Sequence, residues 1–264
     1  MVIALDSSVP QEQPQRLMTI FACARPVLFV NDDPDFPLSV TGTAFVLLFR
    51  GRYFVVSAKH VMRGFEPGQV RIQYRPDSAR FIPLRNRYQF PCNDSTDDDQ
   101  FDVVVWDVDG GIRPELFGPY RPYLLGTDDV WPWPHAEGRR SDYLYRGYPR
   151  ILRRIDFDVQ PVKEYGLDSV TGRGNYLGPA SMAAVHTIEL VLLDEHLPSE
   201  DGLDGMSGSP VFEVILLERN YSTAVFAGMF LRGRRAALRA HFLQQQRIVE
   251  MLTAISLGRA TPPI

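Results

Sequence analysis

The sequence predicts an all-β protein of two halves, with a single helix near its C-terminal end. Short runs rich in β-branched and aromatic residues recur between turn signals, which is typical of a sandwich or a barrel. A proline-rich stretch over residues 119–134 separates the strands into two groups and predicts an irregular connector. Near-helical spacing of apolar residues occurs between about residues 236 and 256.

The first half is expected over residues 20–118. Residues 1–19 combine prolines, serines and glutamines, and predict a flexible N-terminal arm. Two β-rich runs, 42–49 and 53–58, are joined by a short turn that contains a glycine, and together they predict a hairpin. Further strands are expected over residues 70–74, 80–84 and 102–108.

The second half is expected over residues 135–235. Its strands are predicted over residues 142–149, 156–165, 186–193, 210–218 and 223–231. Residues 236–264 complete the chain as a C-terminal helix and tail, with Gly258 as the stop signal of the helix.

Composition excludes several classes of function. The 264 residues carry 28 Lys and Arg against 32 Asp and Glu, a net charge of −4, so no basic excess is present to neutralise a phosphate backbone. Nucleic acid is therefore not an expected partner. Cys23 and Cys92 are too few for a secreted disulfide framework, and we expect two buried thiols. The N-terminus has no signal-peptide pattern and no apolar run is long enough to span a membrane, so we expect a cytoplasmic protein.

The stretch Gly202–Val211, with the sequence GLDGMSGSPV, carries the strongest chemical signal. Gly205, Gly208 and Pro210 surround Ser207 in a segment that must turn sharply. A nucleophilic serine needs such a turn, because its oxygen must stand clear while nearby N–H groups converge on one point. The alternative is a Gly- and Ser-rich loop that only joins two strands.

A histidine and an aspartate complete the set of candidate catalytic groups. His60 lies just past the predicted strand YFVVSA, and Asp102 stands at the entry of the apolar run FDVVVWDV. A carboxylate at that place costs free energy unless it is paired. Taken singly, His60 is as well explained by a structural or exposed histidine, and Asp102 by a turn residue.

Together, in the chain order His60, Asp102, Ser207, these segments resemble the trypsin-like (chymotrypsin-fold) serine peptidases, especially the bacterial members that lack disulfides. In that family a strand ends in Ala-x-His, an aspartate precedes a hydrophobic strand, and the nucleophile lies in Gly-x-Ser-Gly-x-Pro. Residues 205–210 match every fixed position of the last motif, and the likeness extends over about residues 38–257. It implies two antiparallel six-stranded β-barrels with the site between them, and no cofactor.

The resemblance also implies a role for each group. Ser207 would be the nucleophile, His60 its general base and Asp102 the group that orients the imidazole. The backbone N–H groups of Gly205 and Ser207 would receive the oxyanion. Ser209 is the competing nucleophile, although it lies two residues after the serine position of the motif.

The sequence departs from the family at the residue before the serine. Members activated by cleavage pair their new N-terminus with an aspartate there, whereas this chain has Met206, which forms no salt bridge. We therefore expect that any regulation comes from the loop itself or from a regulatory or activating partner protein, as in bacterial stress or defence systems.

Substrate choice is less determined. Asp201 lies six residues before Ser207, where the resemblance implies a preference for cleavage after Arg or Lys; a solvated loop acid is the alternative. Leu231, Arg232 and Gly233 are expected to form the wall along which the substrate backbone pairs as an added strand. Arg232 would either neutralise Asp201 or favour acidic residues.

The sequence thus predicts a serine endopeptidase that acts on protein or peptide substrates. The alternatives are a catalytically silent, protease-like scaffold that binds partner proteins through the same cleft, and a hydrolase of esters. The order Ser…Asp…His of an α/β-hydrolase is not seen. No metal site is expected: the acidic run 97–99 lacks further spaced oxygen ligands, and the histidines show no ligand spacing.

Overall fold

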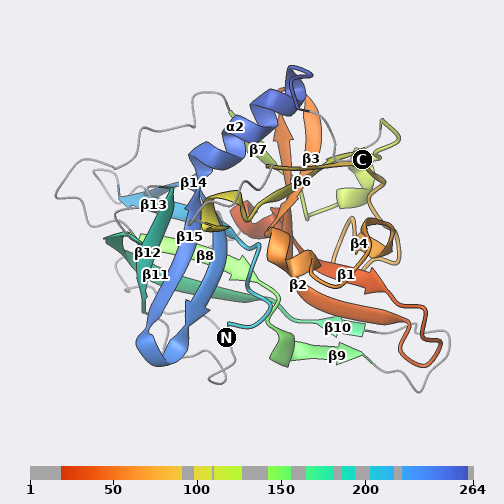
Figure 1. Ribbon diagram of the computed structural model, residues 1–264, viewed down its shortest axis with the longest axis horizontal. Helices are drawn as coiled ribbons and strands as arrows, with labels where there is room; N and C mark the ends of the chain where they lie inside the picture. The colour runs from red at the N-terminus through yellow and green to blue at the C-terminus, as the bar shows by residue number, and fades with distance from the viewer. Residues whose placement is uncertain are drawn as a thin grey trace.

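The computed structural model describes residues 19–90, 98–108, 110–126, 142–155, 165–180, 186–193, 203–216 and 222–260. The strands of the first half form one curved sheet, those of the second half form a barrel beside it, and the C-terminal helix crosses the top of both in Figure 1. This arrangement confirms the all-β fold class with its C-terminal helix. Most of the predicted arm and part of the proline-rich connector lie outside the described residues.

The first half is a seven-stranded sheet. Its antiparallel path runs β4-β1-β2-β3-β6-β5, and β7 pairs parallel to β2. The predicted hairpin is confirmed as β2 and β3. The strand expected over residues 80–84 is wrong: Phe81 forms a single bridge with Gln73, and the next strand begins at Leu84, directly after Pro83, which has no N–H to donate. The strands are β1 (Ala24–Val30), β2 (Leu38–Phe49), β3 (Arg52–Ser57), β4 (Val70–Ile72), β5 (Leu84–Gln89), β6 (Val104–Val108) and β7 (Tyr123–Leu125).

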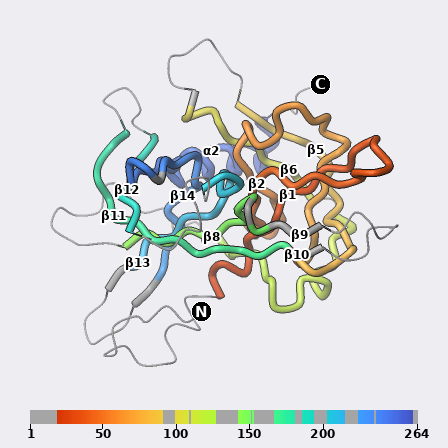
Figure 2. The backbone as a smooth tube through the Cα atoms, turned by 90° about the horizontal axis from the view of Figure 1, so that it is seen from below, coloured from red at the N-terminus to blue at the C-terminus, as the bar shows by residue number. Residues whose placement is uncertain are grey.

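The second half contains a closed six-stranded barrel, in the order β11-β12-β15-β14-β13-β8. All of its pairings are antiparallel. A two-stranded ribbon, β9 with β10, extends from this half toward the first sheet (Figure 2). The strands are β8 (Asp142–Gly147), β9 (Arg153–Ile155), β10 (Tyr165–Leu167), β11 (Val170–Pro179), β12 (Thr187–Leu192), β13 (Pro210–Leu216), β14 (Ser222–Arg234) and β15 (Arg239–Gln244).

The C-terminal helix begins later than the sequence predicts. Helix α2 spans Gln245–Ser256, whereas the preceding residues form β15, the strand that closes the barrel. Ala240 and Phe242 lie two positions apart and are both buried, which is the period of a strand. Leu238 and Phe242 lie four positions apart, which also fits a helix, so the pattern alone could not separate the two structures.

A shared hydrophobic core holds the sheet and the barrel together. Phe212 and Phe226 of the barrel pack against aromatic rings of the first half, with centroids 5.2 Å apart for Phe21 and Phe212 and 5.5 Å for Phe45 and Phe226. Leu252 of α2 is fully buried in the same cluster. Because this core is continuous, residues far apart in the chain have defined positions at the junction of the two halves.

Cys23, at the edge of this core, is fully buried and free. Burial raises the pKa of its thiol to about 12, which keeps it protonated and unreactive at neutral pH. Cys92 lies outside the described residues. Within the described part of the chain, no helix is both long and apolar enough to cross a bilayer.

The buried side chain of Arg25, in β1, donates hydrogen bonds to backbone carbonyls of neighbouring segments. Arg25 has no exposed surface, and its guanidinium donates to the backbone carbonyls of Gln73 and Tyr74 at 3.1 and 3.0 Å. It also donates to the carbonyls of Ala22 and Ala24 at 2.6 and 2.7 Å, and to that of Tyr120. Burial lowers the pKa of Arg25 to about 10, and the group stays charged at neutral pH.

We therefore expect Arg25→Met to lower the free energy of unfolding by about 3 kcal/mol or more, because several buried carbonyls lose their donor at once. Arg259→Met, at an exposed arginine, should change it by less than about 0.5 kcal/mol. Chemical denaturation of both variants measures the difference. Equal stability of the two would show that water replaces the lost donors.

Candidate active site

The pairing of two neighbouring strands brings His60 close to Asp102. Strand β3 ends at Ser57, and a 3-10 turn over Lys59–Met62 follows at once with His60 inside it. Asp102 lies two residues before β6, whose first residue, Val104, pairs with Ser57. The end of β3 and the start of β6 therefore meet at one edge of the sheet, and so do the residues that flank them.

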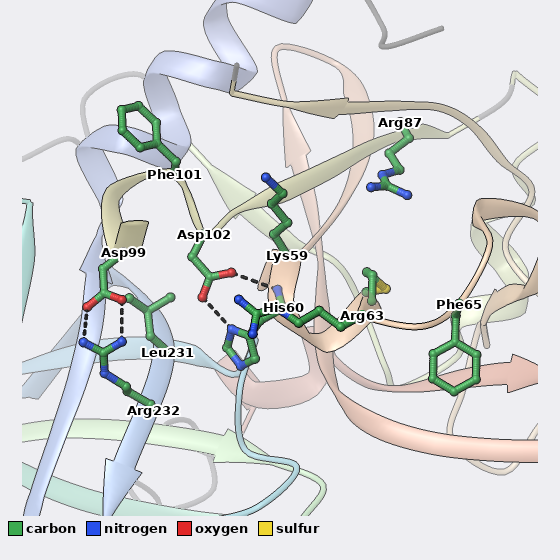
Figure 3. A pocket seen from close by; sticks show the side chains of 11 residues that line it. Lys59, His60, Arg63, Phe65, Arg87, Asp99, Phe101, Asp102, Leu231 and Arg232 are labelled. Atoms are coloured by element: carbon green, nitrogen blue, oxygen red, sulfur yellow. Dashed lines mark hydrogen bonds and ion pairs between the residues drawn. The ribbon is translucent and has the colours of Figure 1, made fainter. Parts of the chain in front are cut away.

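Both oxygens of the Asp102 carboxylate bind His60. The Nδ1 of the ring lies 2.5 Å from Oδ2, and the backbone N–H of His60 donates to Oδ1 at 2.8 Å (Figure 3). The side chains are partly buried, with 31% of His60 and 15% of Asp102 exposed. Among the described residues, Nε2 of His60 has no hydrogen-bond partner. The imidazole is thus held with Nδ1 on the carboxylate and Nε2 available.

The segment around Ser207 is a sharp turn attached to the first sheet. Gly205 and Gly208 have positive φ angles of 91° and 86°, a conformation that favours glycine. Thr43 of β2 donates its N–H to the carbonyl of Ser207 and its hydroxyl to that of Gly205, both at 2.9 Å. A Cβ at Gly208 would lie 1.9 Å from the Thr43 carbonyl oxygen. Nothing in the local sequence marks Thr43 for this role, which depends on a contact across the two halves.

Two amide donors in this turn have no acceptor among the residues that the structure describes. The N–H of Met206 donates to Leu203 O at 3.0 Å, and that of Gly208 donates to Phe230 O at 2.8 Å. Within the described chain, the N–H groups of Gly205 and Ser207 make no hydrogen bond. Two unpaired backbone donors at a tight turn are what stabilisation of an oxyanion requires.

The competing serine is enclosed. Ser209 has no exposed surface, and its hydroxyl donates to the carbonyl of Met206 at 2.6 Å. A Cβ at Gly147 would lie 2.1 Å from this hydroxyl oxygen, which shows how closely β8 covers it. A substrate has no access to Ser209 in this arrangement.

Ser207 does not hydrogen-bond to His60. Its hydroxyl donates to the backbone carbonyl of Leu231 at 2.7 Å. Leu231 is the extra residue of a β-bulge in β14, because Phe230 pairs with Phe242 whereas Arg232 pairs with His241. Of the three groups that the sequence predicts to act together, the structure joins His60 to Asp102 and holds Ser207 on the neighbouring wall.

The predicted substrate-binding wall is an open strand edge. The β13–β14 pairing ends with Pro210 opposite Met229, so within the described chain residues 232–234 of β14 are paired to β15 alone. An extended peptide can add to such an edge. Asp201, the predicted specificity residue, lies outside the described residues.

Arg232, on this edge, forms an ion pair across the two halves. Its two terminal nitrogens bind the two carboxylate oxygens of Asp99, each at 2.6 Å (Figure 3). Asp99 precedes β6 in the same turn as Asp102, and 12% of its side chain is exposed against 61% of Arg232. This fork-to-fork pair gives Arg232 a partner that the sequence did not predict. Its expected contact with Asp201 stays a prediction, since Asp201 lies outside the described residues.

His241, which pairs with Arg232 in the β14–β15 ladder, adds a titratable group behind this edge. Burial lowers its pKa, and the positive charge of Arg232 lowers it further. At neutral pH this histidine is therefore uncharged and contributes no positive charge to the edge.

A cavity of about 640 Å³ opens where these elements meet. The residues that line it come from both halves, and they include the His60–Asp102 pair and the Leu231 wall that receives the Ser207 hydroxyl. The described residues that line it are Lys59, His60, Met62, Arg63, Phe65, Arg87, Asp99, Phe101, Asp102, Leu231 and Arg232.

Comparison with solved structures identifies the architecture as the chymotrypsin-like fold. The crystal structure of the scabies mite inactivated protease paralogue S-D1 superposes with a TM-score of 0.56, covering 92% of this chain and 97% of that one at 14% sequence identity. In all, 388 chains of solved structures match. The sequence matches no protein-family profile and no curated protein. A likeness at this identity shows the fold, and that neighbour is by its name an inactivated protein.

The close approach at Gly208 yields a test of the turn. Gly208→Ala should lower the free energy of unfolding by more than about 3 kcal/mol, because the backbone of Thr43 blocks the added carbon. Gly51→Ala is the matched control: Gly51 also has a positive φ, of 75°, but no atom lies within 4 Å of the added carbon.

We expect Gly51→Ala to cost about 1 kcal/mol, which reports the strain of φ alone. Thermal and urea denaturation of the two variants measure the contrast. Equal losses would show that the turn around Ser207 is not held against β2.

Proposed function

We propose that the protein is a serine endopeptidase, with Ser207 as nucleophile, His60 as general base and Asp102 as the group that orients the imidazole. The observation that carries the proposal is the pair of hydrogen bonds that Asp102 accepts from His60, one from the ring and one from the backbone N–H. A turn with two unpaired amide donors, at Gly205 and Ser207, supports it.

In the proposed reaction, Ser207 Oγ attacks the carbonyl carbon of the scissile peptide bond while its proton passes to His60 Nε2. The negative charge that develops on the carbonyl oxygen is received by the N–H groups of Gly205 and Ser207. His60 then gives the proton to the leaving amine as the C–N bond breaks, and an acyl-enzyme remains. Water, activated by the same imidazole, releases the acid product and restores the serine.

Before the attack, the hydroxyl of Ser207 must exchange one acceptor for another. It donates to Leu231 O in the free protein, and a rotation about its Cα–Cβ bond redirects it. Exposed side chains change rotamer on the picosecond to nanosecond scale. Catalytic hydrogen bonds often form only with substrate bound, so the observed contact is compatible with an active enzyme.

The proposal includes control by a partner protein in the cytoplasm. Position 206 is a methionine, whose thioether is uncharged, so it offers no carboxylate to a newly cut N-terminus. A bacterial stress or defence system is the setting that we propose on the resemblance.

The nucleophile is tested with a fluorophosphonate probe and mapping of the labelled residue. We expect label on Ser207, a loss of at least about a thousandfold in labelling rate in His60→Ala, and full labelling in Ser209→Ala. Label on Ser209, or equal labelling in His60→Ala, would contradict the assignment.

Specificity for basic residues is a separate part of the proposal. If Asp201 lies at the base of the pocket for the residue before the scissile bond, a peptide library should be cleaved after Arg or Lys. Asp201→Asn should lower the preference for these residues by about tenfold or more. Mass spectrometry of the products gives the cleavage positions. Cleavage after other residues would assign Asp201 to the solvated loop instead.

A catalytically silent scaffold is the second candidate, and the hydrogen bond from Ser207 to Leu231 favours it. The structural neighbour, an inactivated protease paralogue, shows that the fold occurs in such a protein. Probe labelling separates the two: a scaffold takes no label even after addition of cell lysate, whereas an enzyme awaiting its activator becomes labelled.

A further inference from the structure

We propose that the cavity beside His60 selects protein substrates that carry an acidic side chain next to the scissile bond, and that Lys59, Arg63 and Arg87 form the site that reads it. This inference rests on the proposed peptidase function and adds the class of substrate to it. We call these three residues the cationic wall.

The charges that line the cavity are unbalanced. Among the described residues, four cationic side chains face it, those of the cationic wall and Arg232, against the carboxylates of Asp99 and Asp102. The whole chain has the opposite balance, with a net charge of −4. The charge around the cavity is therefore opposite in sign to the net charge of the chain, and its electric field favours a negatively charged ligand.

Both carboxylates are already engaged. Asp102 gives its two oxygens to His60, and Asp99 gives its two to Arg232. Arg232 is likewise occupied by this fork-to-fork pair. The excess positive charge therefore lies on the cationic wall.

The cationic wall has no acidic partner among the described residues. Lys59 and Arg63 make no side-chain hydrogen bond or ion pair there. Arg87 donates one nitrogen to the amide oxygen of Gln89 at 3.1 Å, and its Nε is buried without an acceptor. An unsatisfied buried donor on a charged group costs free energy, which an incoming carboxylate would remove.

The position of the wall relates it to the reaction. Lys59 and Arg63 flank His60 in and directly after the 3-10 turn, and Arg63 extends toward His60 in Figure 3. Lys59 and Arg87 lie on the other side of the His60–Asp102 pair from Arg232 (Figure 3). A group bound here therefore sits next to the reacting bond and not on a remote face.

The rest of the cavity suits a peptide. Leu231 and Arg232 belong to the open edge of β14, so side chains of a peptide added to that edge project toward the same space. Phe65 and Phe101 supply apolar surface for the carbon atoms of its side chains. The volume of about 640 Å³ holds several groups, which fits a peptide segment better than a single ion.

Binding tests this inference without turnover. The protein is Ser207→Ala, and the probes are two fluorescent peptide pools of equal length: one has Asp or Glu at a fixed central position, and the other has Asn or Gln there. The flanking positions contain every residue except Asp and Glu, in equal proportions in both pools. Fluorescence anisotropy measures the two affinities.

We expect the acidic pool to bind at least about tenfold more tightly than the amide pool at low salt, and the ratio to fall as salt rises. In the Ser207→Ala background, the double change Arg63→Glu and Arg87→Glu should make the affinities for the two pools equal. Arg63→Lys should retain most of the difference between them. Arg80→Glu changes the same charge at an exposed site away from the cavity and should leave the ratio unchanged. Equal affinities for the two pools would overturn the inference. So would a fall in the affinity ratio in Arg80→Glu as large as the fall in the double variant at Arg63 and Arg87.

A kinetic arm separates this inference from the proposed function. The wild-type enzyme should cleave the acidic pool with the higher kcat/KM. The same arginine substitutions, made again in the chain that keeps Ser207, should still be labelled by fluorophosphonate on Ser207. Labelling without acid preference in either assay overturns the selectivity alone. Acid-selective binding without labelling overturns the peptidase proposal and with it the inference as stated here.

Discussion

The contact between Thr43 and the turn at residues 205–208 is the constraint on which the site depends. Thr43 lies on β2, the strand that pairs with β3, and β3 leads directly into the turn of His60. Its N–H and hydroxyl bind two carbonyls of the turn, its own carbonyl accepts the hydroxyl of Ser57 at 2.7 Å, and Tyr148 N–H donates to its hydroxyl at 3.0 Å. Because one residue engages both halves, the position of Ser207 relative to the first sheet is fixed by backbone atoms.

The glycines of the turn follow from this contact. At Gly208 the conformation is left-handed and the Thr43 carbonyl occupies the space of a side chain, so two separate reasons exclude other residues. At Gly42 an added carbon would lie 2.6 Å from a methyl group of Val61, in the turn that carries His60. The close packing between the turns of His60 and Ser207 therefore requires residues without a side chain on both sides of the junction.

The two carboxylates at the site, Asp102 and Asp99, have different partners and different consequences. The pair of Asp102 with His60 orients a ring and leaves one nitrogen available for proton transfer. The pair of Asp99 with Arg232 crosses from the turn before β6 to the open edge of β14. Among the described residues of that edge, Arg232 is the cation that lines the cavity, and this pair already engages it, so the remaining positive charge lies on the His60 side.

Local sequence determined much of this protein. The positions of His60, Asp102 and Ser207, the hairpin of β2 and β3, and the glycines of the turn could all be predicted, because strand periodicity and turn chemistry act over a few residues. Strand β11 was not predicted, since its glycines lower β-propensity; yet Gly172 is there because the ring of Tyr145 would lie 2.2 Å from an added carbon.

The tertiary structure decided what depends on distant partners. Whether residues 239–244 form a helix or a strand was settled by the need to close the barrel between β12 and β14. Leu231 accepts the Ser207 hydroxyl because a bulge in β14 places its carbonyl there. Asp99 pairs with Arg232 across the two halves. In both contacts the partners lie more than twenty residues apart in the chain. The reason is physical: propensity and pattern are properties of neighbouring residues, whereas hydrogen-bond partners and cavity charge are set by which surfaces the packed core brings together.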